Sequence, residues 1–171
     1  MSDVDAAAAQ AFVSLYHQAL PEVYGYLQRR CHDRALAEDL TSETFLAAVR
    51  AIKDGDVITV GVPWLIGVAR HKLADHWRKR ARDERLQGAL EDEHVEEDDP
   101  WDATLDRVRS DDVLCGLGDH HRSALVLRYV DGLPVPEVAE LLGRTVHATE
   151  ALLVRARRAF RAAYEGGVAS A

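Results

Sequence analysis

An acidic stretch near the middle of the chain most constrains what the protein can fold into. Residues 86–106 contain nine Asp and Glu residues and no Lys or Arg. Like charges at this density repel one another, and the few apolar side chains do not offset the entropy lost on ordering. We therefore expect a flexible linker over residues 86–104. It would divide an all-α chain into two small helical domains, residues 1–85 and residues 105–171.

The composition excludes several classes of protein. The 171 residues carry a formal net charge of -8, but the chain outside residues 86–106 sums to +1, so the acidic total does not argue against a nucleic-acid partner. A hydrophobic fraction of 47% allows a core in each half and excludes a wholly disordered chain. No apolar run reaches the length of a membrane span, and residues 1–20 do not resemble a secretory signal. We therefore expect a cytoplasmic protein.

Residues with metal-binding or catalytic chemistry are scattered. Cys31 and Cys115 belong to no CxxC pattern, so we interpret both as small buried or half-buried residues without a disulfide or zinc site. His71 and His76 are five residues apart, a spacing that does not place two metal ligands on one helix face. No serine stands in a glycine elbow, and no glycine-rich phosphate loop is present. The sequence predicts no catalytic residue, no metal and no cofactor.

Apolar residues spaced three and four apart predict three helices in the first half. They cover residues 6–30, with a kink at Pro21, then a helix from the N-cap Asp33 to residue 52, and a third from Pro63 to residue 85. Residues 57–62 are apolar and β-branched, but no second strand is available nearby, so they are interpreted as a loop. Residues 70–85 carry a local charge of +4, on the side opposite to the apolar residues of the third helix.

The second half has the spacing of a helix-turn-helix. Four helices are predicted at about residues 103–114, 119–129, 136–142 and 145–164, with Asp119 as the N-cap of the second. Gly143 would take the left-handed conformation of the turn, and Thr145 would cap the last helix. Residues 144–161 carry a local charge of +4. A basic helix behind such a turn is typical of a recognition helix that enters the major groove of DNA.

Together the two halves resemble the sigma-70 family of transcription initiation factors, in particular its short extracytoplasmic-function (ECF) class. Residues 33–45, DRALAEDLTSETF, are similar to the family pattern D-A-E-D-L-x-Q-E-x-F. Residues 63–80, PWLIGVARHKLADHWRKR, are similar to W-L-x-x-I-A-R-N-x-x-x-D-x-x-R. Residues 121–129, HRSALVLRY, and the helix-turn-helix resemble the family's region 4. The resemblance implies a region 2 bundle of three or four helices in the first domain and a region 4 bundle in the second.

The resemblance implies a sigma factor, a subunit without catalysis of its own that binds core RNA polymerase, recognises the −35 and −10 promoter elements and promotes melting. Docking on the polymerase is assigned to Asp39, Ser42, Glu43 and Phe45. Contacts to the −10 element are assigned to Asp54, Asp56, Thr59, Arg70, His71, Lys72, Asp75, Arg78 and Arg82. Contacts to the −35 element are assigned to Arg122, Arg144, Thr145, His147, Ala148, Glu150 and Arg155. The implied partners are core RNA polymerase, promoter DNA and an anti-sigma factor, with no membrane insertion.

Three positions depart from the family pattern. Ser42 stands where the family commonly has Gln, residues 57–62 are more apolar than expected, and Pro134 replaces a Ser or Thr cap, which leaves Pro136 to begin its helix. Two other functions stay open on the residues alone. One is a stand-alone helix-turn-helix regulator that binds operator DNA as a dimer, and the other is a helical protein whose basic faces bind acidic partners.

Overall fold

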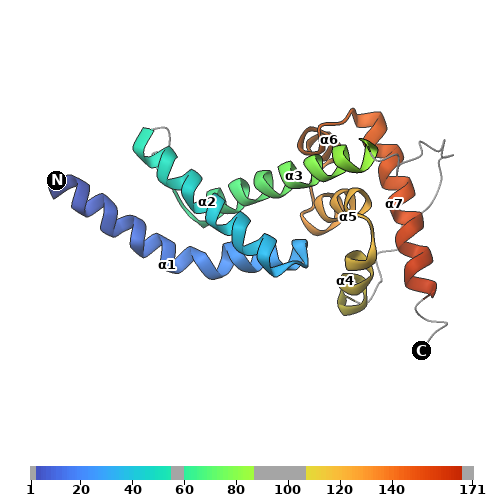
Figure 1. Cartoon of the computed structure of the whole chain (residues 1–171), viewed down its shortest axis with the longest axis horizontal. Helices are drawn as coiled ribbons and strands as arrows, with labels where there is room; N and C mark the ends of the chain where they lie inside the picture. Colours follow the sequence, from blue (N-terminus) through green and yellow to red (C-terminus); the bar gives the residue numbers. More distant parts are fainter. Residues whose placement is uncertain (1–2, 55–59, 87–106, 167–171) are drawn as a thin grey trace. The chain divides into compact units, whose positions relative to one another are not determined.

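The computed structural model of the chain describes residues 3–54, 60–86 and 107–166. These residues form α-helices and one π-helical turn, without any strand among them, which confirms the predicted all-α fold (Figure 1). Their contacts divide the chain into two compact units, Met1–Leu73 and Ala74–Ala171. Most of the predicted linker and two residues of the predicted −10 site, Asp56 and Thr59, lie outside the described residues.

The first unit contains α1 (Asp3–Cys31), α2 (Arg34–Asp54) and the beginning of α3 (Val62–Leu86). Helices α1 and α2 pack along each other (Figure 1), and the ring of Tyr16 meets that of Phe45 edge-on, 4.7 Å between centroids. Asp33 caps α2 as predicted, because its Oδ1 accepts a hydrogen bond from the backbone N–H of Leu36 at 3.1 Å. The buried apolar side chains of this unit include Val23, Leu27, Leu40, Phe45, Leu65 and Leu73.

Helix α3 has one buried and one exposed side, as its sequence predicts. Leu65, Ala69, Leu73 and Trp77 are at most 2% exposed. The first hydrogen bond of the helix runs from the backbone N–H of Leu65 to the carbonyl of Gly61 at 3.0 Å, so the helix begins one residue before Pro63. Its opposite side is therefore available to carry the basic residues of the sequence.

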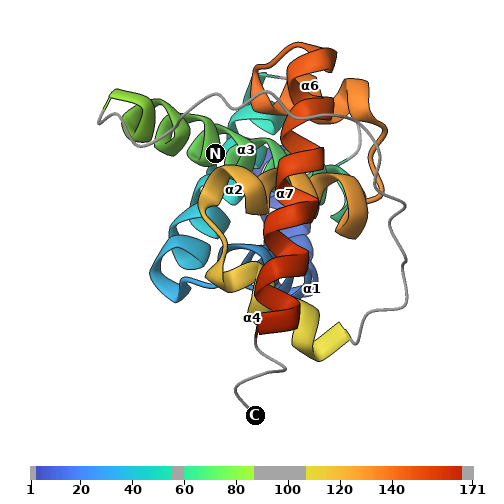
Figure 2. The ribbon, with the colours of Figure 1, turned by 90° about the vertical axis from the view of Figure 1, so that its right-hand side faces the viewer.

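The second unit contains the rest of α3, α4 (Arg107–Gly116), α5 (Asp119–Leu125), the π-helical turn η1 (Val126–Val130), α6 (Val135–Leu142) and α7 (Val146–Gly166). Helix α7 packs against α4, α5 and α6, an arrangement that Figure 2 shows with α7 toward the viewer. The core of this unit includes Leu125, Leu127, Val138, Leu152, Leu153 and Phe160. An amphipathic helix of this kind turns one face to the core and the opposite, polar face to solvent.

Three local predictions in the second unit are wrong. Asp119 is not an N-cap: Gly118 precedes α5 without a side-chain hydrogen bond, and Asp119 is the first residue of the helix. The helix also does not continue regularly to Tyr129, because the backbone N–H of Asp131 bonds to the carbonyl of Val126, five residues back, which is π-helical spacing. Cys115 near the end of α4 is exposed, contrary to the prediction that both cysteines are buried or half-buried, while Cys31 is buried as expected.

Candidate nucleic-acid interface

The turn between α6 and α7 has the backbone geometry that the sequence predicts. Gly143 has φ 62° and ψ 40°, the left-handed region in which glycine is unstrained. Its N–H bonds to the carbonyl of Glu140 at 3.1 Å, and the N–H of Arg144 bonds to the carbonyl of Ala139 at 2.9 Å. This pair of bonds is the Schellman motif, which satisfies the last carbonyls of α6 and sets the direction of the chain into α7.

The start of α7 is held by two threonines. Thr145 Oγ1 accepts a hydrogen bond from the backbone N–H of Ala148 at 3.1 Å, which confirms the predicted N-cap. Thr149 is fully buried, and its Oγ1 donates to the carbonyl of Thr145 at 2.9 Å. The cap of Thr145 and the buried hydrogen bond of Thr149 therefore both hold the N-terminal turn of the helix. The exposed side chains of this turn have a defined position as a result.

Helix α7 divides into a core face and an outward face. Thr149, Leu152, Leu153, Ala156 and Phe160 are buried. Around the outward face, His147 and Glu150 are exposed, while Ala148 and Arg155 are half-buried, as is Arg144 in the turn. A recognition helix contacts base edges with the residues near its N-terminus and phosphates with those around it. All predicted −35 residues except Arg122 thus belong to α7 and the turn before it, and Arg155 lies furthest from the helix start.

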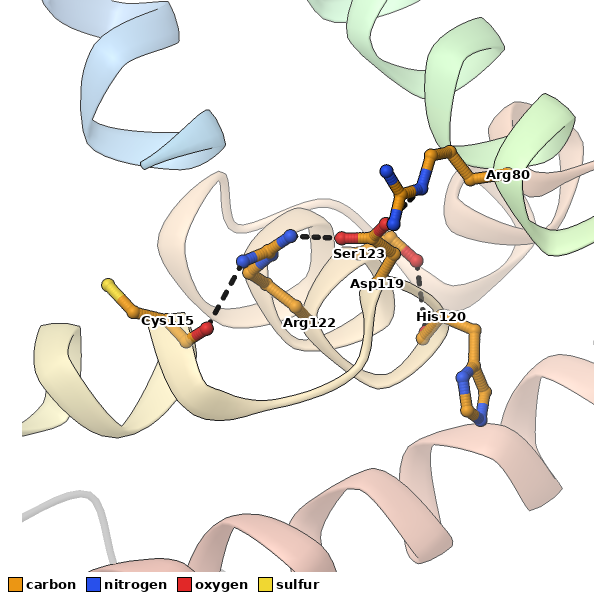
Figure 3. A network of polar contacts seen from close by, with 6 residues as sticks. All are labelled: Arg80, Cys115, Asp119, His120, Arg122 and Ser123. Atoms are coloured by element: carbon orange, nitrogen blue, oxygen red, sulfur yellow. Dashed lines mark hydrogen bonds and ion pairs between the residues drawn. The ribbon is translucent and has the colours of Figure 1, made fainter. Parts of the chain in front are cut away.

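Arg122 lies on α5 in a different environment. Its side chain is only 13% exposed; Nη2 pairs with the Asp119 carboxylate, and Nη1 donates to the carbonyl of Cys115 at 3.4 Å (Figure 3). The other carboxylate oxygen of Asp119 accepts from Nε of Arg80 on α3 at 2.7 Å, so the carboxylate lies between two guanidinium groups. Arg122 joins the C-terminal end of α4 to α5, where a cation is favourable to the helix dipole.

Sequence reasoning missed this role of Asp119. The only local signal was the spacing of three residues to Arg122, which is common on helices. The pairing with Arg80, 39 positions earlier, depends on how the second unit packs and has no signature in the sequence.

Polar side chains also join α7 to the helices beneath it. Burial lowers the pKa of His121 on α5 below its ordinary value of 6.5, and the positive charge of Arg155 lowers it further. The ring of His120 lies beside that of His121, 4.0 Å between centroids. Arg157 donates from Nη1 to the hydroxyl of Tyr129 at 3.0 Å. Arg157 is thus placed by a hydroxyl on η1, and Arg155 lies near the buried ring of His121 on α5.

The predicted −10 residues of α3 differ in their exposure. His71, Asp75 and Arg82 are exposed, and Arg70, Lys72 and Arg78 are half-buried. Asp75 and Arg78 form an ion pair one turn apart, and His71 Nδ1 donates to the carbonyl of Gly67 at 2.9 Å. Asp54, the remaining described residue of the set, is the exposed last residue of α2.

An ion pair in the first unit connects two predicted sites. Lys72 Nζ lies 3.4 Å from the carboxylate of Glu43, so a predicted −10 residue contacts a predicted polymerase-docking residue. Both side chains stay partly exposed, at 35% and 55%. The sequence contains no signal for this pair, because it depends on the packing of α3 beside α2.

The predicted docking residues on α2 divide by exposure. Asp39, Ser42 and Glu43 are exposed, whereas Phe45 is 5% exposed and packs on Tyr16. Ser42 and Phe45 meet at a shallow pocket of about 180 Å³ between α1 and α2. The remaining residues around it include Tyr16, Leu20, Tyr24 and Thr41. This face combines carboxylates with a small apolar depression.

Residues suited to other chemistry are not grouped. Within residues 3–54, 60–86 and 107–166, no three His, Cys, Asp or Glu side chains come together as a metal site. Among the helices that the structure describes, none is long and apolar enough to cross a membrane.

Comparison with known proteins places both halves in one family. Residues 15–83 match Sigma-70 region 2, and residues 111–160 match Sigma-70, region 4. The chain is 36% identical over 160 residues to the ECF RNA polymerase sigma factor BldN of Streptomyces coelicolor, which covers 90% of this chain and 60% of BldN. It is 32% identical over 162 residues to the ECF RNA polymerase sigma factor SigM of Bacillus subtilis, covering 90% of this chain and 95% of SigM.

A solved structure has the same fold. The sigma factor RpoE from Bartonella quintana, crystallised with the anti-sigma factor NepR, aligns with a TM-score of 0.53 and 20% identity over 91% of this chain and 98% of RpoE. The match to SigM extends over nearly the whole of both chains, and the two matched regions are those expected from the motifs. The chain therefore belongs to the extracytoplasmic-function sigma factors of the sigma-70 family.

Proposed function

We propose that the chain directs core RNA polymerase to promoters whose −35 and −10 elements it recognises, and that it promotes melting of the duplex at the −10 element. The observation that carries this proposal is the start of α7, which Gly143 and Thr145 hold in a defined position with His147 and Glu150 facing outward. A helix placed in this way can read base edges in the major groove.

The second unit contributes the contacts to the −35 element. His147, Ala148 and Glu150 of α7 are close enough to the helix start to reach base edges, with Arg144 and Arg155 beside them for phosphates. We assign Thr145 to the same interface through its cap. Arg122 supports this interface indirectly, because it joins α4 to α5. To contact a phosphate, its guanidinium group would have to leave the carboxylate of Asp119.

The outward side of α3 contributes the contacts to the −10 element. Arg70, His71, Lys72, Asp75, Arg78 and Arg82 provide cations and hydrogen-bonding groups along one side of a helix, which suits the backbone of a melted strand. Asp54 ends α2 at the beginning of the chain segment that contains Asp56 and Thr59. We assign these three residues to the −10 interface and base capture to the segment of residues 54–62 as a whole.

The exposed side of α2 would dock on core RNA polymerase. Asp39 and Glu43 offer carboxylates to a basic partner surface. Ser42 and Phe45 both line the small pocket beside them. We further propose that residues 1–85 and 105–171 act as two domains on a flexible linker. The family also implies that the protein has no catalytic activity of its own and works in the cytoplasm. We propose, again from the family, that an anti-sigma factor regulates it.

The proposal is tested by transcription in vitro. The full chain is mixed with core RNA polymerase and a library of random promoter sequences, and the starts of the transcripts are sequenced. We expect starts that share two upstream elements. No transcription above that of core alone on any template would contradict the proposal. Tight binding to a palindromic duplex without polymerase would instead indicate a stand-alone regulator.

A pair of substitutions separates the proposed −35 contact of Arg155 from a general effect of charge. Arg155→Ala should lower the occupancy of −35 DNA by the holoenzyme and reduce the salt dependence of binding by about one phosphate contact. Arg29→Ala on α1 removes the same charge from an exposed position without a proposed DNA contact and serves as the matched control. Equal effects of the two substitutions would contradict the assignment of Arg155.

A further inference from the structure

We propose that Glu150 selects a cytosine in the upstream promoter element by accepting a hydrogen bond from the amino group of that base. The inference rests on the proposed function, because it requires that the start of α7 reads promoter DNA. It adds the identity of a base to that function and assigns the choice to one side chain.

The position of Glu150 is defined by the backbone. It is the fifth residue of α7, one turn after the Thr145 cap, and its side chain is exposed. The neighbouring Thr149 is fully buried and bonded to the carbonyl of Thr145, so this turn of the helix has little freedom to rotate. His147, one turn earlier, is exposed on the same outward side. A side chain of this length at this place reaches base edges when the helix enters the groove.

The carboxylate of Glu150 has no partner within the part of the chain that the structure describes, since no hydrogen bond or ion pair involves it. Other carboxylates differ. Asp75 pairs with Arg78 and Asp119 pairs with Arg122, each with an arginine three residues further along its helix. Three and four residues after Glu150 come Leu153 and Val154, so the helix supplies no basic neighbour there.

An unpaired carboxylate is costly on a surface that binds polyanionic DNA. Glu150 is the single acid in residues 144–161, which otherwise contain five arginines, and it reduces the attraction of this face for phosphates. A contact to a phosphate is therefore excluded for this side chain by charge. The contact that suits it is a donor on a base, which only the major-groove edges of cytosine and adenine provide.

Base chemistry favours cytosine over adenine. In the major groove, guanine offers the acceptors N7 and O6, and thymine offers O4 and a methyl group, so neither can pair with a carboxylate. Adenine has a donor at N6, but its N7 acceptor lies beside that donor and repels a negative oxygen. Cytosine offers the N4 amino group without an acceptor next to it. A carboxylate thus selects cytosine, whereas an uncharged amide in its place fits the donor and acceptor of adenine.

The test uses holoenzyme formed from the full chain and core RNA polymerase. Binding is selected from a duplex library that is randomised across the upstream element and constant at the downstream element. Four chains are compared: the natural chain, Glu150→Gln, Glu150→Ala and the control Glu140→Gln. The control removes one negative charge from an exposed position on α6 of the same helix-turn-helix. Circular dichroism checks that each chain is folded.

We expect the natural chain and Glu140→Gln to prefer cytosine at one position of the upstream element by about tenfold or more. Glu150→Gln should change the preferred base at that position to adenine, and Glu150→Ala should lose the preference there while the other positions are unchanged. An upstream motif that is the same for all four chains would overturn the role of Glu150 and leave the proposed function intact. The absence of any upstream preference in the natural chain would overturn the reading of DNA by α7 itself.

Discussion

The two basic helices of this protein, α3 and α7, begin in different ways. Helix α7 is preceded by a Schellman turn at Gly143 and capped by Thr145. Helix α3 follows Gly61, whose carbonyl accepts the first helical hydrogen bond but which has no side chain to cap the free N–H groups. The difference matches where each helix carries its proposed contacts. The base contacts proposed for α7 lie within its first five residues, where the cap determines their position, while the contacts proposed for α3 lie between residues 70 and 82.

The two helices also differ in how carboxylates meet their cations. On α3, Asp75 pairs with Arg78, and Lys72 pairs with Glu43 of α2. On α7, Glu150 is the single acid of residues 144–161, and it pairs with no described residue. Exposed ion pairs of the α3 kind contribute little stability, so their main effect is to hold long side chains in place. We infer that α3 offers a surface that follows the DNA backbone, while α7 offers a side chain that distinguishes one base from another.

The largest expected effects come from the buried side of each helix. Phe160→Ala in α7 should lower the free energy of unfolding by about 3–5 kcal/mol, and Leu65→Ala in α3 by about 2–5 kcal/mol, because both remove side chains that are at most 3% exposed. Urea denaturation followed by circular dichroism measures both. Leu46→Ala at a side chain 56% exposed is the control and should change little. A cost below about 1 kcal/mol for Phe160→Ala would contradict the packing of α7.

The glycines of the two helices should respond with opposite signs. Gly143→Ala places a Cβ on a residue with φ 62° and 3.2 Å from Cδ of Arg78, so it should destabilise the protein by about 1–2 kcal/mol. Gly67→Ala in the interior of α3 meets no atom within 4 Å and should stabilise by about 0.5–1 kcal/mol. Thermal or urea unfolding of the two variants compares them directly. An unchanged free energy of unfolding for Gly143→Ala would contradict the proposed difference between the two helix starts.

The caps should differ by a smaller amount. Thr145→Ala removes the acceptor for the N–H of Ala148 and should cost about 1 kcal/mol, whereas Thr145→Ser keeps the acceptor and should cost less. Adding a cap to α3 by Gly61→Ser should gain only a few tenths of a kcal/mol, since glycine is itself tolerated at this position. The midpoints of urea denaturation measure all three. An equal cost for Thr145→Ala and Thr145→Ser would show that the hydroxyl does not act as a cap.

The smallest expected effect depends on pH. Burial and Arg155 lower the pKa of His121 in the folded protein below the ordinary value of 6.5, so below that pH the unfolded chain binds more protons than the folded one. Stability should therefore fall as the pH decreases from 6.5, because protonation places a charge on a half-buried ring and beside Arg155 of α7. The unfolding free energy of the natural chain is measured from pH 7.5 to about 5 against His121→Gln. Parallel curves for the two chains would refute this linkage.

Much of the architecture was predictable because its signals are local. Periodic apolar residues predicted every α-helix of the described chain, and Asp33, Gly143 and Thr145 were predicted in the roles that the backbone gives them. These signals concern hydrogen bonds between residues a few positions apart. The role of Asp119 was predicted wrongly because only local signals were available. An Asp before an apolar run resembles an N-cap, although here Gly118 takes that position.

The sequence by itself determined the helices, the helix-turn-helix and the acidic stretch that marks the middle of the chain, since spacing and charge along the chain decide these features. Only the tertiary structure decided which charges meet. Lys72 reaches Glu43 from another helix, and Asp119 lies between Arg80 and Arg122. It also decided that Glu150 has no partner among the described residues. Pairing depends on distances across packed helices, and those distances follow from how side chains fill the core.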